Sequence, residues 1–516
     1  MNSRNLITNV GALAALGLAL TGCPSNETPD TGVLPDAVSG ADAFADSDAF
    51  VGRDAFIAND AFVGTDAGTD ANVDAFVVGD AGPVIPPITT TAPHRVAASA
   101  AGHDRYFGVA FDRTSGFYVT GQIQDGTAAT DDVRTVVAHF TAAGELDTTF
   151  GTAGFYTNNF AVGTNGEVAR GIGVQSDGKI VIGLTIEHAG AADTRDRDWA
   201  VARLLPNGTL DATFGTAGVA VLDLSPGLID GTSYRADGAW GLAIDATDRI
   251  ILSGQQVRTG NLDSDFAIVR LTPNGARDAT FATNGVFNLD IGETNASARG
   301  VTVAADGSIY GSGYYTPVGS TVVTAVAYKL DTNGALVTAF SGDGVYTEAV
   351  LAIQTEIYSI GVQGSNLVTA GYGRATGMTN DFISLRINGT TGVRDATYGG
   401  RGYAMLDMGW PLGDNARDVV VLPDNRVMML GQLRGPITTD APAGDQDAAL
   451  VMLTPDGALD TTFDTDGVFT TNFGGITDHF WAGAADPRSG RVVVVGIASA
   501  LPATNDDGAI YLFPSR

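Results

Sequence analysis

One short stretch of sequence recurs six times over the last four-fifths of the chain, and this repeat constrains the fold more than any other feature. The stretch reads LDTTFGTAG at its first occurrence, from Leu146, and each later copy keeps an aromatic residue in the same place. These aromatic anchors are Phe150, Phe214, Phe281, Phe340, Tyr398 and Phe463. Their average spacing of about 63 residues is too long for a helical-hairpin repeat and is typical of a propeller blade.

A glycine follows every aromatic anchor by four residues. The six glycines are Gly154, Gly218, Gly285, Gly344, Gly402 and Gly467. Because the position is glycine in all six copies, we expect a turn with positive φ, in which a Cβ would clash.

Each repeat unit also reads as four short strands. In the second unit we expect strands over 171–175, 179–186, 199–205 and 219–224, with turns at Ser176-Asp177-Gly178 and Pro206-Asn207-Gly208. Four antiparallel strands per unit, without an amphipathic helix, indicate a β-propeller. A stack of β-sandwich domains is the alternative, but each sandwich needs about 100 residues.

The ends of the repeat region predict how the ring closes. After the sixth unit, residues 481–486, 491–497 and 509–513 supply three strands of a further blade, and a fourth is missing. Residues 94–99 lie at the right distance before the first blade to be that fourth strand. We therefore predict an all-β fold, a seven-bladed β-propeller over 94–516, in which the N-terminal strand completes the last blade and leaves no open sheet edge.

The repeat resembles a known family. The lines D-G-K-I-V-x-G, at Asp177–Gly183, and L-D-x-x-F-G-x-x-G, at Leu210–Gly218, are similar to the delta-sixty repeat, a β-propeller family of unknown function. The fourth unit departs from the pattern, with Val337 in place of the aspartate. The resemblance implies a propeller in a secreted or surface protein of bacteria, and it implies no activity.

The N-terminus has the features of a lipoprotein signal. Arg4 precedes an apolar run from Leu6 to Leu20, which is too short to span the membrane comfortably and suits a secretory signal. The following Leu20-Thr21-Gly22-Cys23 resembles a bacterial lipobox, which implies a signal peptide over 1–22 and diacylation (palmitate or a similar acyl chain) at Cys23. The alternative is an ordinary signal peptide with a chance cysteine. Pro24 in place of aspartate implies the outer membrane, with surface exposure left open.

Residues 23–93 form an acidic low-complexity segment built from Asp-Ala-Phe units. Aspartate recurs every six residues from Asp36 to Asp66, and residues 24–93 carry 11 Asp and Glu27 against Arg53, a net charge of −11. Like charges at this density extend a chain, and scattered Phe cannot form a core, so we predict a disordered tether. Binding of calcium or of a partner by this segment is the alternative.

Charge and cysteine content exclude several partners and sites. The chain has 28 Lys plus Arg against 58 Asp plus Glu, a net charge of −30. This charge excludes general binding of nucleic acid, because replacing phosphate counterions requires basic residues. It also opposes casual aggregation, so we expect a monomeric propeller. A single Cys leaves no intrachain disulfide and no thiolate metal site.

The first strands of the seven blades place alternating aromatic residues and arginines in one aligned position. These residues are Phe107, Arg170, Trp240, Arg299, Tyr358, Arg417 and Trp481. If the first strand is innermost, they surround one mouth of the central channel. Arginine binds carboxylate or phosphate and aromatic rings stack on sugars, so the pattern predicts a small anionic or glycan ligand. In the alternative, these side chains fold sideways between blades and serve packing only.

Two further features of the repeat have a structural interpretation. The recurrent line carries Asp147, Asp211, Asp278, Asp395 and Asp460, and the third strand carries His139, Arg203, Arg270, Lys329 and Arg386. A short acceptor can bond turn amides, and a neighbouring cation can pair with it. Since Lys329 accompanies Val337, and Met452 accompanies Asp460, we interpret them as two separate structural features.

The sequence assigns no catalytic residue, no metal site and no cofactor. The five His have no metal-ligand spacing, and no nucleophile elbow or phosphate loop is present. Calcium is a candidate at Asp464–Gly467 and at Asp193, Asp196 and Asp198, but neither has the twelve-residue loop of an EF-hand. The sequence does not exclude Asp418 and Asp486 as catalytic carboxylates near the channel mouth.

These observations favour a lipid-anchored, non-catalytic binding or scaffold protein of the cell envelope. Its partners would be the membrane, through the N-terminal lipid, and an envelope glycan or protein. One alternative is a hydrolase or lyase acting on glycans or esters, with carboxylates at the channel mouth. Another is a structural or calcium-dependent adhesive surface protein.

Overall fold

The chain divides into two compact units, Met1–Ser39 and Gly40–Arg516, and all residues described here belong to the second. The computed structural model describes residues 53–54, 94–99, 102–124, 126, 132–160, 166–188, 196–225, 228–230, 233–257, 263–292, 296–407, 413–434, 446–475, 477–499 and 506–513. The predicted signal peptide, Cys23 and nearly all of the predicted tether lie outside these residues. Within these residues, we find no helix with the length and apolar character needed to cross a membrane.

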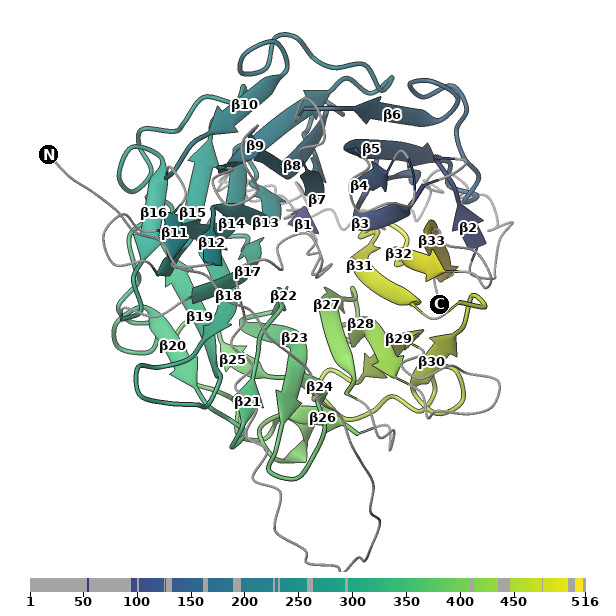
Figure 1. Ribbon diagram of the computed structural model, residues 1–516. Coiled ribbons are helices and arrows are strands. Elements are labelled where there is room, and N and C mark those ends of the chain that lie inside the picture. Colours follow the sequence, from purple (N-terminus) through teal and green to yellow (C-terminus); the bar gives the residue numbers. More distant parts are fainter. Residues whose placement is uncertain are drawn as a thin grey trace, which may run out of the picture. The chain divides into compact units, whose positions relative to one another are not determined.

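Seven blades form a ring, and Figure 1 shows the first strand of each blade nearest to the centre. The first blade comprises β3 (Asp104–Phe111), β4 (Phe117–Gln124), β5 (Val133–Phe140) and β6 (Phe155–Asn158). The second comprises β7 (Glu167–Val174), β8 (Ile180–Glu187), β9 (Arg197–Leu204) and β10 (Val219–Leu222). The third comprises β13 (Gly238–Ile244), β14 (Ile250–Val257), β15 (Ser264–Leu271) and β16 (Val286–Leu289). The fourth comprises β17 (Ala296–Val303), β18 (Ile309–Tyr315), β19 (Thr324–Leu330) and β20 (Val345–Glu348).

The fifth blade has the same four strand positions with two of them interrupted. It comprises β21 (Gln354–Thr355), β22 (Ser359–Gln363), β23 (Asn366–Arg374), β24 (Asp381–Ser384), β25 (Arg386–Asn388), the short 3-10 helix η1 (Tyr398–Gly400) and β26 (Ala404–Leu406). The sixth comprises β27 (Asn415–Val421), β28 (Val427–Arg434), β29 (Gln446–Leu453) and β30 (Val468–Thr471). The seventh comprises β31 (His479–Ala485), β32 (Val492–Ser499), β33 (Asp506–Phe513) and β2 (His94–Val96).

Two small elements lie outside the seven blades. A hairpin of β11 (Leu228–Asp230) and β12 (Ser233–Arg235) precedes the third blade. The two-residue strand β1 (Arg53–Asp54), from the segment predicted as tether, pairs in parallel with β13 at the centre of the ring.

The predicted closure of the ring is confirmed. The N-terminal strand β2 pairs antiparallel with β33, with His94 opposite Ile510 and Val96 opposite Gly508. Arg95 reinforces this strand by donating hydrogen bonds to the carbonyl oxygens of Phe473, at 2.5 Å, and of Ser499. Strands from the two ends of the repeat region thus share one sheet, which covers the edge that the last blade would otherwise expose.

Deleting the closing strand is expected to destabilise the ring. The buried carboxylate of Asp104 accepts hydrogen bonds from the amides of Ala98, at 2.7 Å, and Ser99, at 2.8 Å, so the deletion removes these donors as well as the β2 pairing. At about 1 kcal/mol per lost hydrogen bond, a chain starting at residue 100 should be less stable than one starting at residue 88 by at least about 3 kcal/mol. Urea unfolding of the two chains measures the difference, and equal midpoints would contradict the closure.

The recurrent motif takes the predicted conformation. All six aromatic anchors are buried, and all six glycines that follow them have positive φ. At Gly218, where φ is 102°, an added Cβ would lie 2.4 Å from Cγ of Leu210, so the turn requires glycine. The buried hydrophobic residues that the structure describes form seven clusters, and clusters such as that of Tyr118, Ile172 and Ile182 join neighbouring blades.

Candidate functional site

The residues that the sequence aligned at the channel lie at irregularities of the innermost strands. The register between the first and second strands shifts around six of them, for example between Ala169 and Gly171 on either side of Arg170. In the fifth blade, Tyr358 lies in the gap between β21 and β22. A β-bulge turns one side chain away from the regular alternation of a strand. The six bulges and the gap at Tyr358 therefore direct these seven side chains around the ring.

The seven side chains contact one another in a chain, which we call the central belt. The guanidinium carbons of Arg170 and Arg299 both lie 4.0 Å from the ring centroid of Trp240. Arg299 and Arg417 lie 4.8 and 5.1 Å from the ring of Tyr358. The structure thus brings these residues together, and their contacts run sideways between blades.

The chain of contacts continues from Arg417 to the first blade. Arg417 lies 4.8 Å from the ring of Trp481, and the rings of Trp481 and Phe107 meet edge to face at 5.8 Å. Trp240 is half-buried, whereas the other six belt residues are 0–6% exposed. Desolvated cation–π contacts contribute about 2 kcal/mol each, so the belt also holds the inner strands together.

Aromatic residues support the belt from the second strands. Arg299 donates a hydrogen bond of 2.8 Å to the hydroxyl of Tyr314, and the hydroxyl of Tyr358 lies 3.2 Å from that of Tyr372. His479 is buried beside Trp481, with ring centroids 5.2 Å apart. Burial, and then the positive charges of Arg417 and Arg105, hold the pKa of His479 well below its ordinary value, so this imidazole is neutral.

Buried acids stand three residues before the belt residue in five blades, and the sequence analysis did not identify them. We call them the inner acids: Asp104, Glu167, Asp237, Asp414 and Asp478. Their carboxylates accept hydrogen bonds from loop and strand amides, as Asp478 does from Phe473 at 2.7 Å and from Ser499 at 2.8 Å. Burial raises the pKa of Asp104 and Asp478 to about 6. In the sequence, these acids could have been found by their constant position, three residues before a belt residue.

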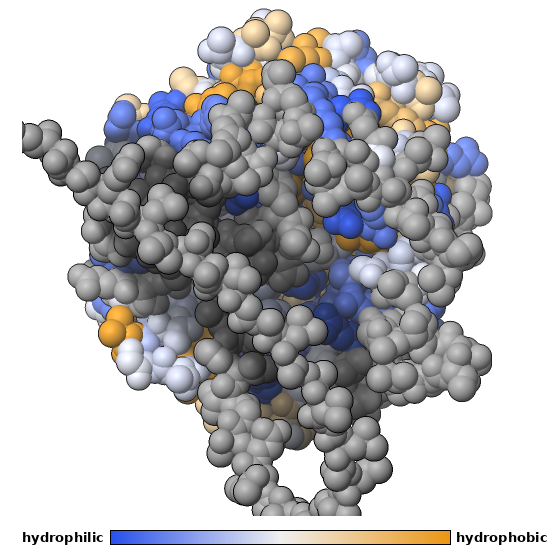
Figure 2. Space-filling view, in the orientation of Figure 1, coloured by the Kyte–Doolittle hydropathy of each residue, from blue (hydrophilic) through white to orange (hydrophobic). Residues whose placement is uncertain are grey.

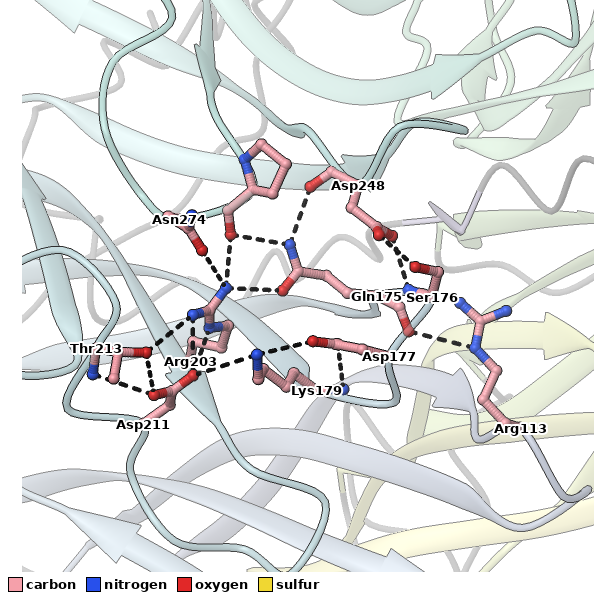
Figure 3. Close-up of polar contacts among 11 residues, drawn as sticks. Arg113, Gln175, Ser176, Asp177, Lys179, Arg203, Asp211, Thr213, Asp248 and Asn274 are labelled. Carbon is pink, nitrogen blue, oxygen red and sulfur yellow. Dashed lines mark hydrogen bonds and ion pairs between the residues drawn. The ribbon is translucent and has the colours of Figure 1, made fainter.

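The cation of the third strand and the aspartate of the recurrent line form one structural unit, which corrects our interpretation of them as separate features. In the second blade, Nε of Arg203 donates to Asp211 at 3.0 Å (Figure 3). The guanidinium of Arg203 also lies 4.7 Å from the ring of the anchor Phe214. The same guanidinium donates to the carbonyl of Pro273 in the third blade at 2.6 Å. We call this unit the interblade clasp.

The clasp also involves backbone atoms that follow the anchor. The amide of Gly215 donates to the carbonyl of Asn274, and a Cβ at Gly275 would lie 2.7 Å from Cζ of Phe214. Phe214 thus packs against a turn of the next blade, and Phe150, Phe281 and Tyr398 do the same at Gly208, Gly334 and Gly457. Where the aspartate or the arginine is missing, other groups substitute: Lys329 donates to the carbonyl of Gly389 at 2.9 Å, and Arg426 pairs with Asp460 at 3.2 Å.

The two carboxylates that the sequence left open near the channel have structural roles. Asp418 is fully buried and accepts hydrogen bonds from Ser359 at 2.5 Å and from the amide of Gly483 at 3.0 Å. Asp486 accepts from the amide of Arg488 at 3.1 Å and from the hydroxyl of Ser489 at 2.8 Å. Both carboxylates are fully buried and bind groups of the protein itself.

Within the residues that the structure describes, two groups of three aspartates have carboxylate oxygens within 4.8 Å of one another. The first contains two of the sequence candidates for calcium, Asp196 and Asp198, with Asp223; the third candidate, Asp193, lies outside the described residues. The second, which the sequence analysis did not identify, is formed by Asp263, Asp265 and Asp290. Among the described residues, the other candidate, Asp464–Gly467, forms no group of three.

The exposed surface offers no broad apolar patch among the described residues. Figure 2 shows hydrophilic residues over much of the described surface, with hydrophobic ones in separate places near the periphery. In the part of the chain that the structure describes, the exposed large hydrophobic side chains come from five separate segments: Val221, Val318, Met378, Val393 and Leu459. Scattered residues of this kind are normal for a protein surface.

Comparison with known proteins supports the propeller fold. Residues 175–214 and 246–281, in the second and third blades, match the model of a family described as "Domain of unknown function (DUF5122) beta-propeller". No curated protein matches the chain.

Solved structures show only a distant likeness. A glucose dehydrogenase is 10% identical with a TM-score of 0.37, over 66% of this chain and 95% of its own. The β-propeller domain of the Trilobed protease from Pyrococcus furiosus is 9% identical with a TM-score of 0.39, over 82% and 97%. A gluconolactonase from Xanthomonas campestris is 14% identical with a TM-score of 0.30, over 68% and 95%. Likeness at this level supports no conclusion about activity. The architecture of the chain is that of a seven-bladed β-propeller.

Proposed function

We propose that this protein is a lipid-anchored, non-catalytic binding protein of the bacterial cell envelope, and that its central belt binds an anionic or glycan ligand. The observation that carries the proposal is the continuous stacking of Arg170, Arg299 and Arg417 on aromatic rings around the centre of the propeller. A ring closed by seven blades holds these groups in fixed positions before a ligand arrives, which lowers the entropy cost of binding.

The belt has the chemistry that such a ligand requires. Stacking uses the face of a guanidinium, whereas carboxylates and phosphates are bound through its N–H groups in the plane, so one arginine can do both. Three cations close together also stand out in a chain whose net charge is −30. Trp240, the half-buried member of the belt, adds an aromatic ring of the kind that stacks on sugars.

The anchor and the tether are part of the same proposal. A lipid at Cys23 would attach the chain to the membrane, and the acidic segment, apart from Arg53–Asp54, which pair with β13, would hold the propeller away from it. Replacing Cys23 by alanine should remove palmitate incorporation and shift the protein from the membrane fraction to the soluble fraction.

A hydrolase is the weaker candidate. Asp418 and Asp486 are occupied by hydrogen bonds from the protein itself. The inner acids likewise bond backbone amides.

Binding at the belt can be tested by separating charge from packing. Alanine would leave gaps between stacked rings, so glutamine is the better replacement at Arg170, Arg299 and Arg417. The lipid-free chain, residues 88–516, should be retained on polygalacturonate, an anionic glycan, and less on neutral dextran. The triple glutamine variant should lose at least about tenfold in affinity, as expected when about 1.4 kcal/mol or more is lost.

Two controls decide how the result is read. Arg401→Gln removes an exposed arginine that lies over Tyr403, away from the belt, and should leave retention unchanged. A triple lysine variant keeps the charge and should bind better than the triple glutamine variant. Equal retention by the wild type and the folded triple glutamine variant would refute the belt as a ligand site.

A further inference from the structure

The two aspartate groups occupy the same place in consecutive blades. In the second blade, Asp196 and Asp198 lie at the start of β9, and Asp223 follows the end of β10. In the third blade, Asp263, Asp265 and Asp290 lie at the start of β15 and after β16. Each aspartate of the third blade is 67 residues beyond its counterpart, the same interval that separates Phe214 from Phe281. The two groups are therefore one structural feature that the repeat has placed twice.

We use the word corner for the place where the start of the third strand meets the residue that follows the fourth strand. In two other blades, this corner contains an asparagine, whose amide donates a hydrogen bond to an aspartate. In the first blade, Nδ2 of Asn159 donates to Asp132 at 2.6 Å. In the sixth blade, Nδ2 of Asn472 donates to Asp447 at 2.6 Å. In the second and third blades, the position of the asparagine is taken by aspartate, and an ionised carboxylate has no proton to donate. These two corners thus bring carboxylates together without the amide that joins the pair elsewhere.

A buried carboxylate in each group has an oxygen atom without a hydrogen-bond partner. Asp263 is only 4% exposed, and neither of its side-chain oxygens accepts a hydrogen bond. Asp198 is also 4% exposed; its Oδ2 lies 2.6 Å from Nε2 of His188, but its Oδ1 has no hydrogen-bond partner. Burying an ionised carboxylate with unsatisfied oxygen atoms is costly, so a cation bound to the free oxygens of Asp198 and Asp263 would stabilise the two groups.

We infer that these corners are a pair of equivalent binding sites for a hard divalent cation, with calcium as the best fit. All the gathered atoms are carboxylate oxygens, and calcium accepts several carboxylates together with water in flexible geometry. The outermost aspartate of each group, Asp223 or Asp290, is exposed, which leaves room for water ligands and a path of entry. Zinc and copper prefer nitrogen or sulfur ligands, which these groups do not supply apart from His188.

The alternative to a cation is internal compensation. Arg258 follows β14 directly, in the chain position that His188 has after β8, and it lies outside the described residues. A protein in which Arg258 or a shared proton neutralises the aspartates would be indifferent to calcium. The sites and the central belt are separate, so failure of one proposal leaves the other standing.

Calcium binding by the full chain tests the inference. Equilibrium dialysis of the purified protein against calcium should show two more ions bound to the wild type than to a chain with both groups changed to asparagine. Changing Asp263 and Asp265, or Asp196 and Asp198, should each remove one ion. With few carboxylates and no EF-hand loop, we expect dissociation constants of about 10⁻⁴ to 10⁻³ M.

Melting temperatures give a second readout that a purely structural role would not reproduce. Calcium should raise the melting temperature of the wild type relative to EDTA, because it binds the folded chain only. Asp263→Asn with Asp265→Asn should reduce this shift by about half while raising, or leaving unchanged, the melting temperature in EDTA. Asp290→Asn, at the exposed edge, tests the same site with the least disturbance of the core.

A matched control removes two charges from the other acidic pair. Asp464→Asn with Asp466→Asn changes exposed residues outside both groups and should leave both the number of bound ions and the calcium-induced shift unchanged. Terbium offers a check on the site itself, since Trp199 adjoins Asp198 and can transfer energy to an ion in the second blade. Equal calcium binding by the wild type and the asparagine variants, or no effect of calcium on the wild type at about 1 mM, would overturn the inference.

Discussion

Replacing Arg270 by alanine is expected to reduce the free energy of unfolding by about 3–5 kcal/mol, the usual cost of removing one partner from a buried ion pair. Arg270 is 1% exposed, and its Nε donates to Asp278 at 2.9 Å. Its Nη1 also donates to the carbonyl of Thr332 in the next blade at 2.6 Å, and its guanidinium lies 4.4 Å from the ring of Phe281. The substitution therefore removes contacts within one blade and between two blades.

Arg277, which directly precedes Asp278 in the chain, supplies the control. Arg277 is exposed on the same segment, so Arg277→Ala should change the free energy of unfolding by less than about 1 kcal/mol in urea titrations. A double-mutant cycle of Arg270 and Asp278 should show a coupling energy of about 1–3 kcal/mol. If Arg270→Ala is no more costly than Arg277→Ala, the interblade clasp does not stabilise the ring.

The stability of the propeller is expected to rise as the pH is lowered from 8 to about 5, and to fall again below about pH 4. Burial raises the pKa of Asp104 and Asp478 to about 6, and that of Asp237 and Asp414 to about 7, from an ordinary value of 3.8. A raised pKa in the folded state means that folding favours the protonated form. The stabilising effect of protonating these buried acids is complete below the pKa that they have in the unfolded chain, and it is lost as the pH rises through 6 to 7.

The acids of the interblade clasps act in the opposite direction. Hydrogen bonds from Thr397, and then from Arg386, lower the pKa of Asp395 to about 2. The pKa of Asp211 and of Asp278 is also lowered, by hydrogen bonds from threonine and by the paired arginine against the opposing effect of burial. Their stabilising effect is present above the unfolded pKa and is lost as the pH falls below about 4. The two groups of acids together place the maximum between about pH 4 and 5.

A single substitution isolates the raised pKa values. Asp414→Asn keeps an oxygen that can accept from the amide of Arg434 but cannot ionise, so it should stabilise the protein by about 2–4 kcal/mol at pH 8 and much less at pH 5. Asp343→Asn, an exposed aspartate whose oxygen accepts from the amide of Val345, is the control and should have little effect at either pH. Urea titrations at several pH values measure both, and a variant that runs parallel to the wild type across this range would contradict the assignment.

Much of the fold could be predicted because the determining signals are local and repeated. The anchor line, with a glycine four residues after each aromatic residue, predicted the turns, and the structure confirms them at positions such as Phe214 and Gly218. The strands of the second blade match the predicted ranges to within a few residues. The missing fourth strand at one end and the spare strand at the other were enough to predict the pairing of β2 with β33.

The candidate site could be predicted only in part. Alignment of the first strands identified the seven belt residues, but whether Arg299 would face the channel or stack on Trp240 depended on the bulge at that position. The sequence also showed an arginine and an aspartate in most repeats without showing that Arg203 reaches Pro273 in the next blade. The sequence showed that Asp196 and Asp198 are close together along the chain, but their contact with Asp223 depends on the pairing of β9 with β10.

The sequence by itself determined the period, the four strands of each blade, the number of blades and the strand that closes the ring. These properties depend on hydrophobic alternation, turn residues and spacing, all of which are expressed over short distances along the chain. Only the tertiary structure decided which polar side chains meet: the belt, the clasps, the inner acids and the aspartate groups. Such contacts join residues of different strands or blades, and their geometry is set by register and bulges, which one-dimensional spacing does not encode.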